Sequence, residues 1–195
     1  DRELSPSIPN VRCANRDAGA MATRALIEAG RRHPLLLTSR LGPRNLREAG
    51  YRAEVERAGL EPRIVTVPFD TPIPQRFALV QGSLDEARAQ APIDGVFATD
   101  DLAAAEVLEW ARSRSLSVPG DLSVIGFDGT ETMRRALPHL ATIRQPIAQI
   151  ARAAVDILLG QMRGTLPRPI DEAGDNPAPT LEFAGTLVQG RSLSL

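Results

Sequence analysis

Charged side chains that could bind a polar ligand follow short apolar runs of this chain. Asp100 and Asp101 come directly after "GVFAT", and Asp128 comes directly after "LSVIGF". Arg44 and Arg47 follow a third apolar run, "PLLLT". A carboxylate can accept hydrogen bonds from two adjacent hydroxyl groups, and a guanidinium fork supplies complementary donors. These residue types are suited to binding a small polar ligand.

Helical and strand-like segments alternate along the chain, and this alternation predicts where the charged side chains lie. Helical periodicity occurs at residues 17–32, 43–59, 75–90, 101–115 and 149–164. Runs of strand length occur at residues 34–38, 62–67, 94–99 and 121–127, and the tail at 179–188 ends as a strand. Such alternation predicts an α/β fold with a parallel sheet and helices on both faces. Ligands collect at the carboxyl ends of parallel strands, where Phe69 would add an aromatic side chain.

Each of these charged residues also has a structural explanation. An Asp before a helix often accepts backbone N–H bonds as an N-cap, which fits one of Asp100 and Asp101. Asp128 precedes Gly129, and Asp-Gly is a turn signal. An Arg inside a helical pattern, such as Arg47, is usually a solvated surface residue. The spacing therefore supports a site at this edge of the sheet but does not identify its ligand.

The composition is that of a globular protein. With 195 residues, 43% of them hydrophobic, the chain can form one ordinary domain or two small lobes. A net charge of −1 lacks the basic footprint of an independent nucleic-acid binder. Cys13 stands alone and His33 and His139 are far apart, so no disulfide, metal site or cofactor is expected. Neither a catalytic Ser-His-Asp or Cys-His arrangement nor a phosphate-binding glycine loop is apparent, so we expect no enzyme.

The ends of the chain and one internal stretch are typical of loops. No apolar run approaches the roughly 20 residues of a membrane span. The beginning, "DRELSPSIPN", is polar and is not a signal peptide, and we expect it to lie within a domain. The Pro- and Asp-rich stretch "TLPRPIDEAGDNPAP" at residues 165–179 is predicted to be a loop or linker.

Longer motifs resemble one protein family. The segment "LSVPGDLSVIGFDG", followed by "LATIRQP", resembles the effector-binding core of the lactose-repressor/galactose-repressor family of bacterial transcription regulators. "NRDAGAMATRALIEAGRRH" resembles the segment that opens the second lobe in this family, and "LREAGYRAEVERAGL" resembles its "R-x-x-G-[YF]" helix. The resemblance covers nearly the whole chain, and its parts follow in the family's order.

This resemblance implies a periplasmic-binding-protein-like type I fold with two parallel-sheet lobes. Residues 15–145 and 176–195 would form the complete second lobe. Residues 1–14 and 146–175 would be fragments of the first. The family's DNA-binding helix-turn-helix domain is not found in this sequence.

The resemblance also implies a set of effector-binding residues in a cleft between the lobes. Matched position by position to the family's motifs, they are Arg47, Asp128, Asp100, Phe69, Gln145 and Asp1. The family usually has Asn where this chain has Asp100. Because an ionised carboxylate only accepts hydrogen bonds, the effector must be donor-rich at this point, or Asp100 must pair with Arg47.

A two-fold dimer is the expected assembly. Its interface is predicted to include Leu102, Ala105, Leu108, Trp110, Met133 and Leu137. A Trp such as Trp110 is more often a core or interface residue than a ligand-binding one, and we expect it at or near this contact.

The function implied is that of a cytoplasmic, ligand-sensing domain of a transcriptional regulator, a repressor. It would bind a sugar or a related polyol or nucleoside and act on operator DNA through a separate N-terminal domain, without a membrane partner. The alternative is a periplasmic solute-binding protein of a sugar transport system, which shares the two-lobed architecture.

Overall fold

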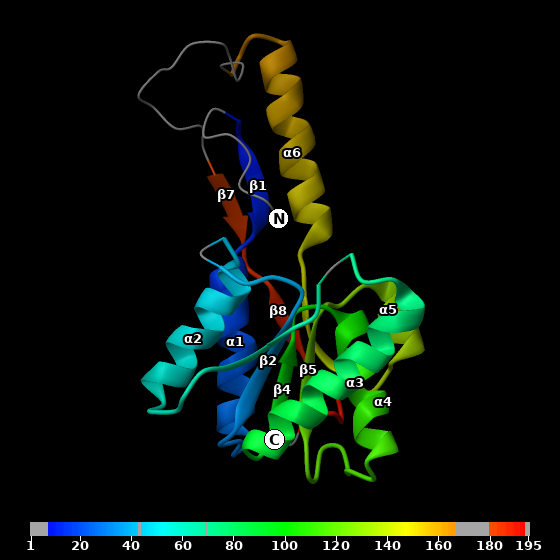
Figure 1. The fold of residues 1–195 in the computed structure, drawn as a ribbon. Helices are drawn as coiled ribbons and strands as arrows, with labels where there is room; N and C mark the ends of the chain where they lie inside the picture. Colours follow the sequence, from blue (N-terminus) through cyan, green and yellow to red (C-terminus); the bar gives the residue numbers. More distant parts are fainter. Residues whose placement is uncertain (1–7, 43, 69, 167–179, 194–195) are drawn as a thin grey trace.

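A six-stranded sheet forms the centre of the molecule (Figure 1). The computed structural model describes residues 8–42, 44–68, 70–166 and 180–193. The strands run across the sheet in the order β3 (Arg63–Thr66), β2 (Pro34–Thr38), β4 (Gly95–Ala98), β5 (Ser123–Asp128), β6 (Ala141–Arg144) and β8 (Thr186–Val188). Neighbouring strands are parallel except for β8, which is antiparallel to β6. The predicted α/β fold with a parallel sheet is confirmed.

Four helices cover the two faces of this sheet. They are α1 (Asn15–Glu28) and α2 (Leu46–Arg57) on one face, and α3 (Ile73–Gln90) and α4 (Asp101–Ser113) on the other. Successive side chains of a strand point to opposite faces. In β2, Leu36 packs with α1 and α2, whereas Leu35 and Leu37 pack with α3 and α4. These two buried layers fix the strands whose ends carry the charged residues.

Trp110 lies in the layer formed by α3 and α4. Its side chain is 0% exposed, and its indole Nε1 donates a hydrogen bond of 2.8 Å to Asp85. This burial contradicts the expectation that Trp110 contributes to a dimer interface, because a side chain without exposed surface cannot contact a second copy.

A smaller unit projects beyond the carboxyl ends of the strands (Figure 1). It consists of β1 (Asn10–Cys13), which pairs in parallel with β7 (Thr180–Phe183), and of α6 (Ile147–Met162). The chain enters or leaves it between β1 and α1, between β6 and α6, and between β7 and β8. The unit is therefore connected to the large sheet at three points along the same edge.

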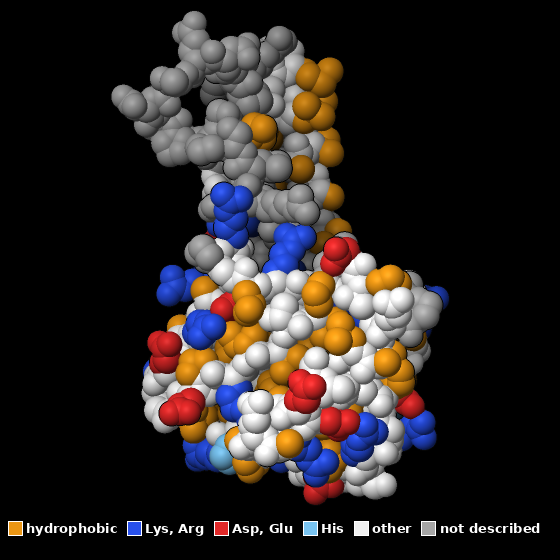
Figure 2. All heavy atoms as spheres, in the orientation of Figure 1, with side chains coloured by type: hydrophobic (Ala, Val, Ile, Leu, Met, Phe, Trp, Pro, Cys, Tyr) orange, Lys and Arg blue, Asp and Glu red, His pale blue; other side chains and the backbone are white. Residues whose placement is uncertain are grey.

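Helix α6 carries apolar side chains on its surface, and Figure 2 shows them along the projection. None of its residues is buried among the described part of the chain. Its exposed large apolar side chains are Ile147, Val155, Leu158, Leu159 and Met162. A contiguous exposed apolar surface is typical of a contact with further protein.

Most of the predicted elements are confirmed, and three were missed. The missed elements are β1, β6 and the short helix α5 (Glu131–Ala136). The tail forms two strands, β7 and β8, where one was predicted. Each missed strand is only four residues long, which leaves little periodicity to detect. The predicted loop at residues 165–179 lies mostly outside the described residues.

No helix in the described part of the chain is long and apolar enough to cross a membrane.

Candidate functional site

Asp128 ends β5 at the carboxyl edge of the sheet. Its φ is 108°, and Gly129 follows with a φ of 59°, so the chain turns sharply here. Oδ1 of Asp128 accepts a hydrogen bond of 2.7 Å from Nε2 of Gln145 and lies 3.9 Å from Nη2 of Arg47. Burial raises the pKa of Asp128, and the contacts with Gln145 and Arg47 partly oppose this rise. The site thus holds a partly desolvated acceptor beside a cation.

Arg47 is held from several sides. Its Nε donates to Oδ1 of Asn15 at 2.9 Å, and Nη1 donates to the Thr99 carbonyl oxygen. The centre of its guanidinium lies 3.6 Å from the ring centroid of Phe127, a cation–π contact. Burial lowers the pKa of Arg47, and the nearby Asp128 is the main opposing influence. Arg47 is therefore a positioned guanidinium rather than a solvated surface residue.

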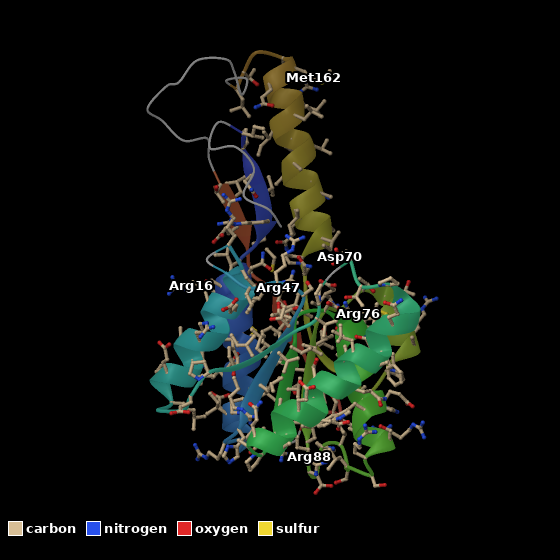
Figure 3. All side chains as sticks on the ribbon, viewed as in Figure 1. Arg16, Arg47, Asp70, Arg76, Arg88 and Met162 are labelled. Atoms are coloured by element: carbon tan, nitrogen blue, oxygen red, sulfur yellow. The ribbon has the colours of Figure 1, made fainter. Side chains whose placement is uncertain are left out.

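The close packing of α1 against α2 places Arg47. A side chain at Gly19 would overlap the backbone of Arg47, and one at Gly50 would overlap the backbone of Arg16. Because both positions are glycine, the two helices approach closely enough for Arg47 to reach Asn15 at the start of α1. Figure 3 shows Arg47 where these helices meet the carboxyl ends of the strands, below the projecting α6.

Asp100 and Asp101 have different roles. Asp100 is the N-cap of α4, and its Oδ1 accepts a hydrogen bond of 2.7 Å from the Ala103 amide. The carboxylate of Asp101 is buried instead: Oδ2 accepts the Gly129 amide at 2.9 Å, and Oδ1 accepts the Thr142 hydroxyl at 2.6 Å. Capping thus accounts for one of the two, and the other connects α4 to β5 and β6.

The structure brings together three of the predicted effector-binding residues directly: Arg47, Asp128 and Gln145. Asp100 is close enough to influence the pKa values of Arg47 and Asp128. Arg44 is exposed. Asp1 and Phe69 lie outside the described residues.

Sequence reasoning missed the residues that support this site. Asn15, Thr99 and Phe127 hold Arg47 in place. Phe127 directly precedes Asp128 and packs on the face of the sheet that α1 and α2 cover, which is the side from which Arg47 approaches. The contact of Arg47 with Asn15 joins positions 32 residues apart, and no local pattern predicts it.

The remaining predicted interface residues lie on and after α4. Leu102 is 54% exposed, whereas Ala105, Leu108, Met133 and Leu137 are partly buried. Leu108 and Leu137 also pack against the core on the α3 and α4 side. Leu102 is therefore the member of this set with the most apolar surface left for a contact.

The chemistry available at the edge of the sheet is that of polar recognition. Carboxylate and amide oxygens can accept hydrogen bonds from hydroxyl groups, and the guanidinium of Arg47 can donate. Within the described ranges no group of His, Cys, Asp and Glu side chains is suited to holding a metal ion. Arg47, Asp128 and Gln145 at the carboxyl edge of the large sheet, where the chain crosses three times to the smaller unit, form an arrangement suited to binding a small polar molecule.

Comparison with known proteins identifies the family. Residues 23–193 match the family of periplasmic binding protein-like domains. The sucrose operon repressor of Pediococcus pentosaceus is 37% identical over 163 residues, which are 82% of this chain and 48% of the repressor. The ribose operon repressor of Halalkalibacterium halodurans is 28% identical over 173 residues, which are 88% of this chain and 50% of that protein.

Among solved structures, the complex of the transcriptional regulator CelR with cellobiose has a TM-score of 0.75 at 25% identity. The match covers 97% of this chain and 55% of that one. The chain therefore belongs to the family of periplasmic binding protein-like domains, and its resemblance to the effector-binding domains of lactose-repressor-type regulators is confirmed. It spans about half the length of the curated relatives it matches.

Proposed function

We propose that this chain is the ligand-sensing part of a bacterial transcriptional repressor and that its effector is a sugar. The observation that carries the proposal is the meeting of Arg47, Asp128 and Gln145 at the carboxyl edge of the parallel sheet. The named relatives support it, since they are the repressors of sucrose and ribose operons and a regulator in complex with cellobiose. The same names favour a regulator over a transport protein and over an enzyme.

The effector would lie in a cleft between two lobes. We assign the six-stranded sheet with α1 to α5 to the second lobe, and β1, β7 and α6 to the first. The sequence-based bounds placed residues 176–195 in the second lobe, but the pairing of β7 with β1 favours the first lobe for Thr180–Phe183. The exposed apolar side chains of α6 support this division, because a helix of the first lobe would need further protein to cover them. Asp128 would accept from sugar hydroxyls and Arg47 would donate to sugar oxygens.

The repressor would act as a two-fold dimer in the cytoplasm. The surface around Leu102, with Ala105, Leu108, Met133 and Leu137, would form the contact between copies. A ligand that binds one lobe orientation better shifts the balance of orientations, and such coupling is typically worth about 1–3 kcal/mol. A separate DNA-binding domain would read the operator, since this chain has a net charge of −1 and is not expected to bind DNA specifically by itself.

Calorimetric titration of the full-length protein tests this proposal. The parent protein should bind at least one of sucrose, ribose and cellobiose, and Arg47→Ala should weaken that binding by about 1.5–3 kcal/mol, the scale of a charged hydrogen bond. Arg52→Ala is a matched control, because Arg52 lies on the same helix and forms its ion pair with Glu48. Equal binding by the Arg47 and Arg52 variants would contradict the assigned site.

A further inference from the structure

Asp101 is a buried carboxylate that the proposed effector site does not use. Its side chain is 2% exposed, and it accepts hydrogen bonds from two neutral donors, the Gly129 amide and the Thr142 hydroxyl. Burial raises the pKa of Asp101, and the hydrogen bonds from Thr142 and Gly129 only partly oppose this rise. Burying an ionisable group is unfavourable for stability, so stability alone does not explain why a carboxylate occupies position 101.

Those contacts join three segments at the edge of the sheet. Asp101 begins α4, Gly129 belongs to the turn after β5, and Thr142 lies within β6. The space for the carboxylate exists because residue 126 is glycine: a side chain there would overlap Oδ1 of Asp101. The three segments and this glycine form one packed arrangement.

The turn that Asp101 holds is the one that orients Asp128. Asp128 has a φ of 108°, which is unfavourable for residues other than glycine and persists only where the surroundings enforce it. The Gly129 amide bonded to Asp101 follows Asp128 directly, and the Asp128 carbonyl accepts from the Gln145 amide at 3.1 Å. The backbone of Asp128 is thus fixed on both sides.

We propose that Asp101 is a positioning residue that sets effector affinity without touching the effector. Through Gly129 and Thr142 it holds the turn after β5, and so keeps the Asp128 carboxylate beside Arg47 and Gln145. This inference rests on the proposed function, in which Asp128 binds the effector.

Thr142→Val is the informative variant, because it keeps the side-chain shape and removes the hydroxyl that donates to Asp101. Thr142→Ser keeps the hydroxyl and should restore the parent behaviour. Ser192→Ala is the matched control: the Ser192 hydroxyl is also buried and also connects β5 and β6, donating to the Val124 carbonyl and accepting from the Ala141 amide. These contacts lie at the opposite end of the strands from Asp128.

The first measurement needs no ligand. Hydrogen exchange of the segment 126–131 in the full-length protein should be several-fold faster in Thr142→Val than in the parent, and unchanged in Ser192→Ala. Equal exchange in all variants would overturn the proposal, whether or not the protein binds a sugar.

The second measurement is the calorimetric affinity for whichever of sucrose, ribose and cellobiose the parent binds. Thr142→Val should bind roughly 3- to 10-fold more weakly, as expected for one hydrogen bond, while Thr142→Ser and Ser192→Ala bind like the parent. Unchanged affinity in Thr142→Val, despite faster exchange, would overturn the positioning role. If the parent binds none of the sugars, the proposed function fails, and the exchange measurement still decides whether Asp101 holds the turn.

Discussion

Asp128→Asn separates effector binding from folding at the candidate site. Asn adopts positive φ more readily than most residues, so the variant should keep the turn at 108°, where Ala would add backbone strain. Oδ1 of Asp128 accepts from Gln145, and we assign Oδ2 to the effector hydroxyls. The substitution therefore removes the negative charge and replaces the effector-facing acceptor Oδ2 with an amide NH2, which can only donate.

The expected loss follows from the charged hydrogen bond that the substitution removes. Hydrogen bonds to charged groups contribute about 1.5–3 kcal/mol. Because the amide NH2 cannot accept from the effector hydroxyls, the variant should bind the effector more weakly by this amount, which is roughly a 10- to 150-fold higher Kd. The free energy of unfolding should hold steady or rise at neutral pH, because burial already disfavours the ionised Asp128, as its raised pKa indicates.

Two assays on the full-length protein check this prediction. Calorimetric titration gives the Kd for the sugar that the parent binds, and thermal unfolding gives the stability. If Asp128 serves only the turn, the variant will bind as the parent does and its Tm will fall. That pattern would refute the assignment of Asp128 as an effector ligand.

Three further outcomes are expected. Asp100→Asn should leave Tm unchanged, because Asn caps helices as well as Asp does, but should change the order of preference among sucrose, ribose and cellobiose in calorimetry; an unchanged order would limit Asp100 to capping. Because the pKa of Asp128 is raised in the folded state, its protonation stabilises the fold at pH values below the unfolded pKa of about 3.9, and this contribution is lost as the pH rises through the folded pKa. Urea unfolding should therefore show Asp128→Asn gaining stability relative to the parent over that pH window. Parallel curves of stability against pH for the two proteins would contradict this. Leu102→Asp should dissociate the dimer in sedimentation equilibrium, whereas Leu41→Asp, which also replaces an exposed leucine, should not; a dimer in both would exclude the α4 surface.

The large sheet could be predicted because its strands and helices have strong local signals. The run "PLLLT" is buried along its whole length, and residues 34–38 form β2 as predicted. The short strands β1 and β6 escaped prediction because their pairing partners, not their own sequence, make them strands. β1 pairs with β7 about 170 residues later in the chain, from Asn10 to Thr180. Pairing at this separation depends on the fold and not on periodicity.

The site could be predicted in part. Strand ends at the carboxyl edge identified Asp128, and the family motif identified Arg47 and Gln145. Their support could not be predicted, since Arg47 depends on Asn15 and Phe127 from other elements. Trp110 was predicted to lie at an interface because an aromatic residue in an apolar helix fits either an interface or the core. Its burial against α3, where it donates to Asp85, places it in the core.

The most direct test of sensing is the effect of sugar on operator binding by the full-length protein, measured as fluorescence anisotropy of labelled operator DNA. Saturating concentrations of the sugar that binds in calorimetry should change the operator affinity by roughly 5- to 150-fold in either direction, corresponding to a coupling of about 1–3 kcal/mol. Asp128→Asn should require proportionally more sugar for the same change. An operator affinity that no bound sugar alters would contradict the account.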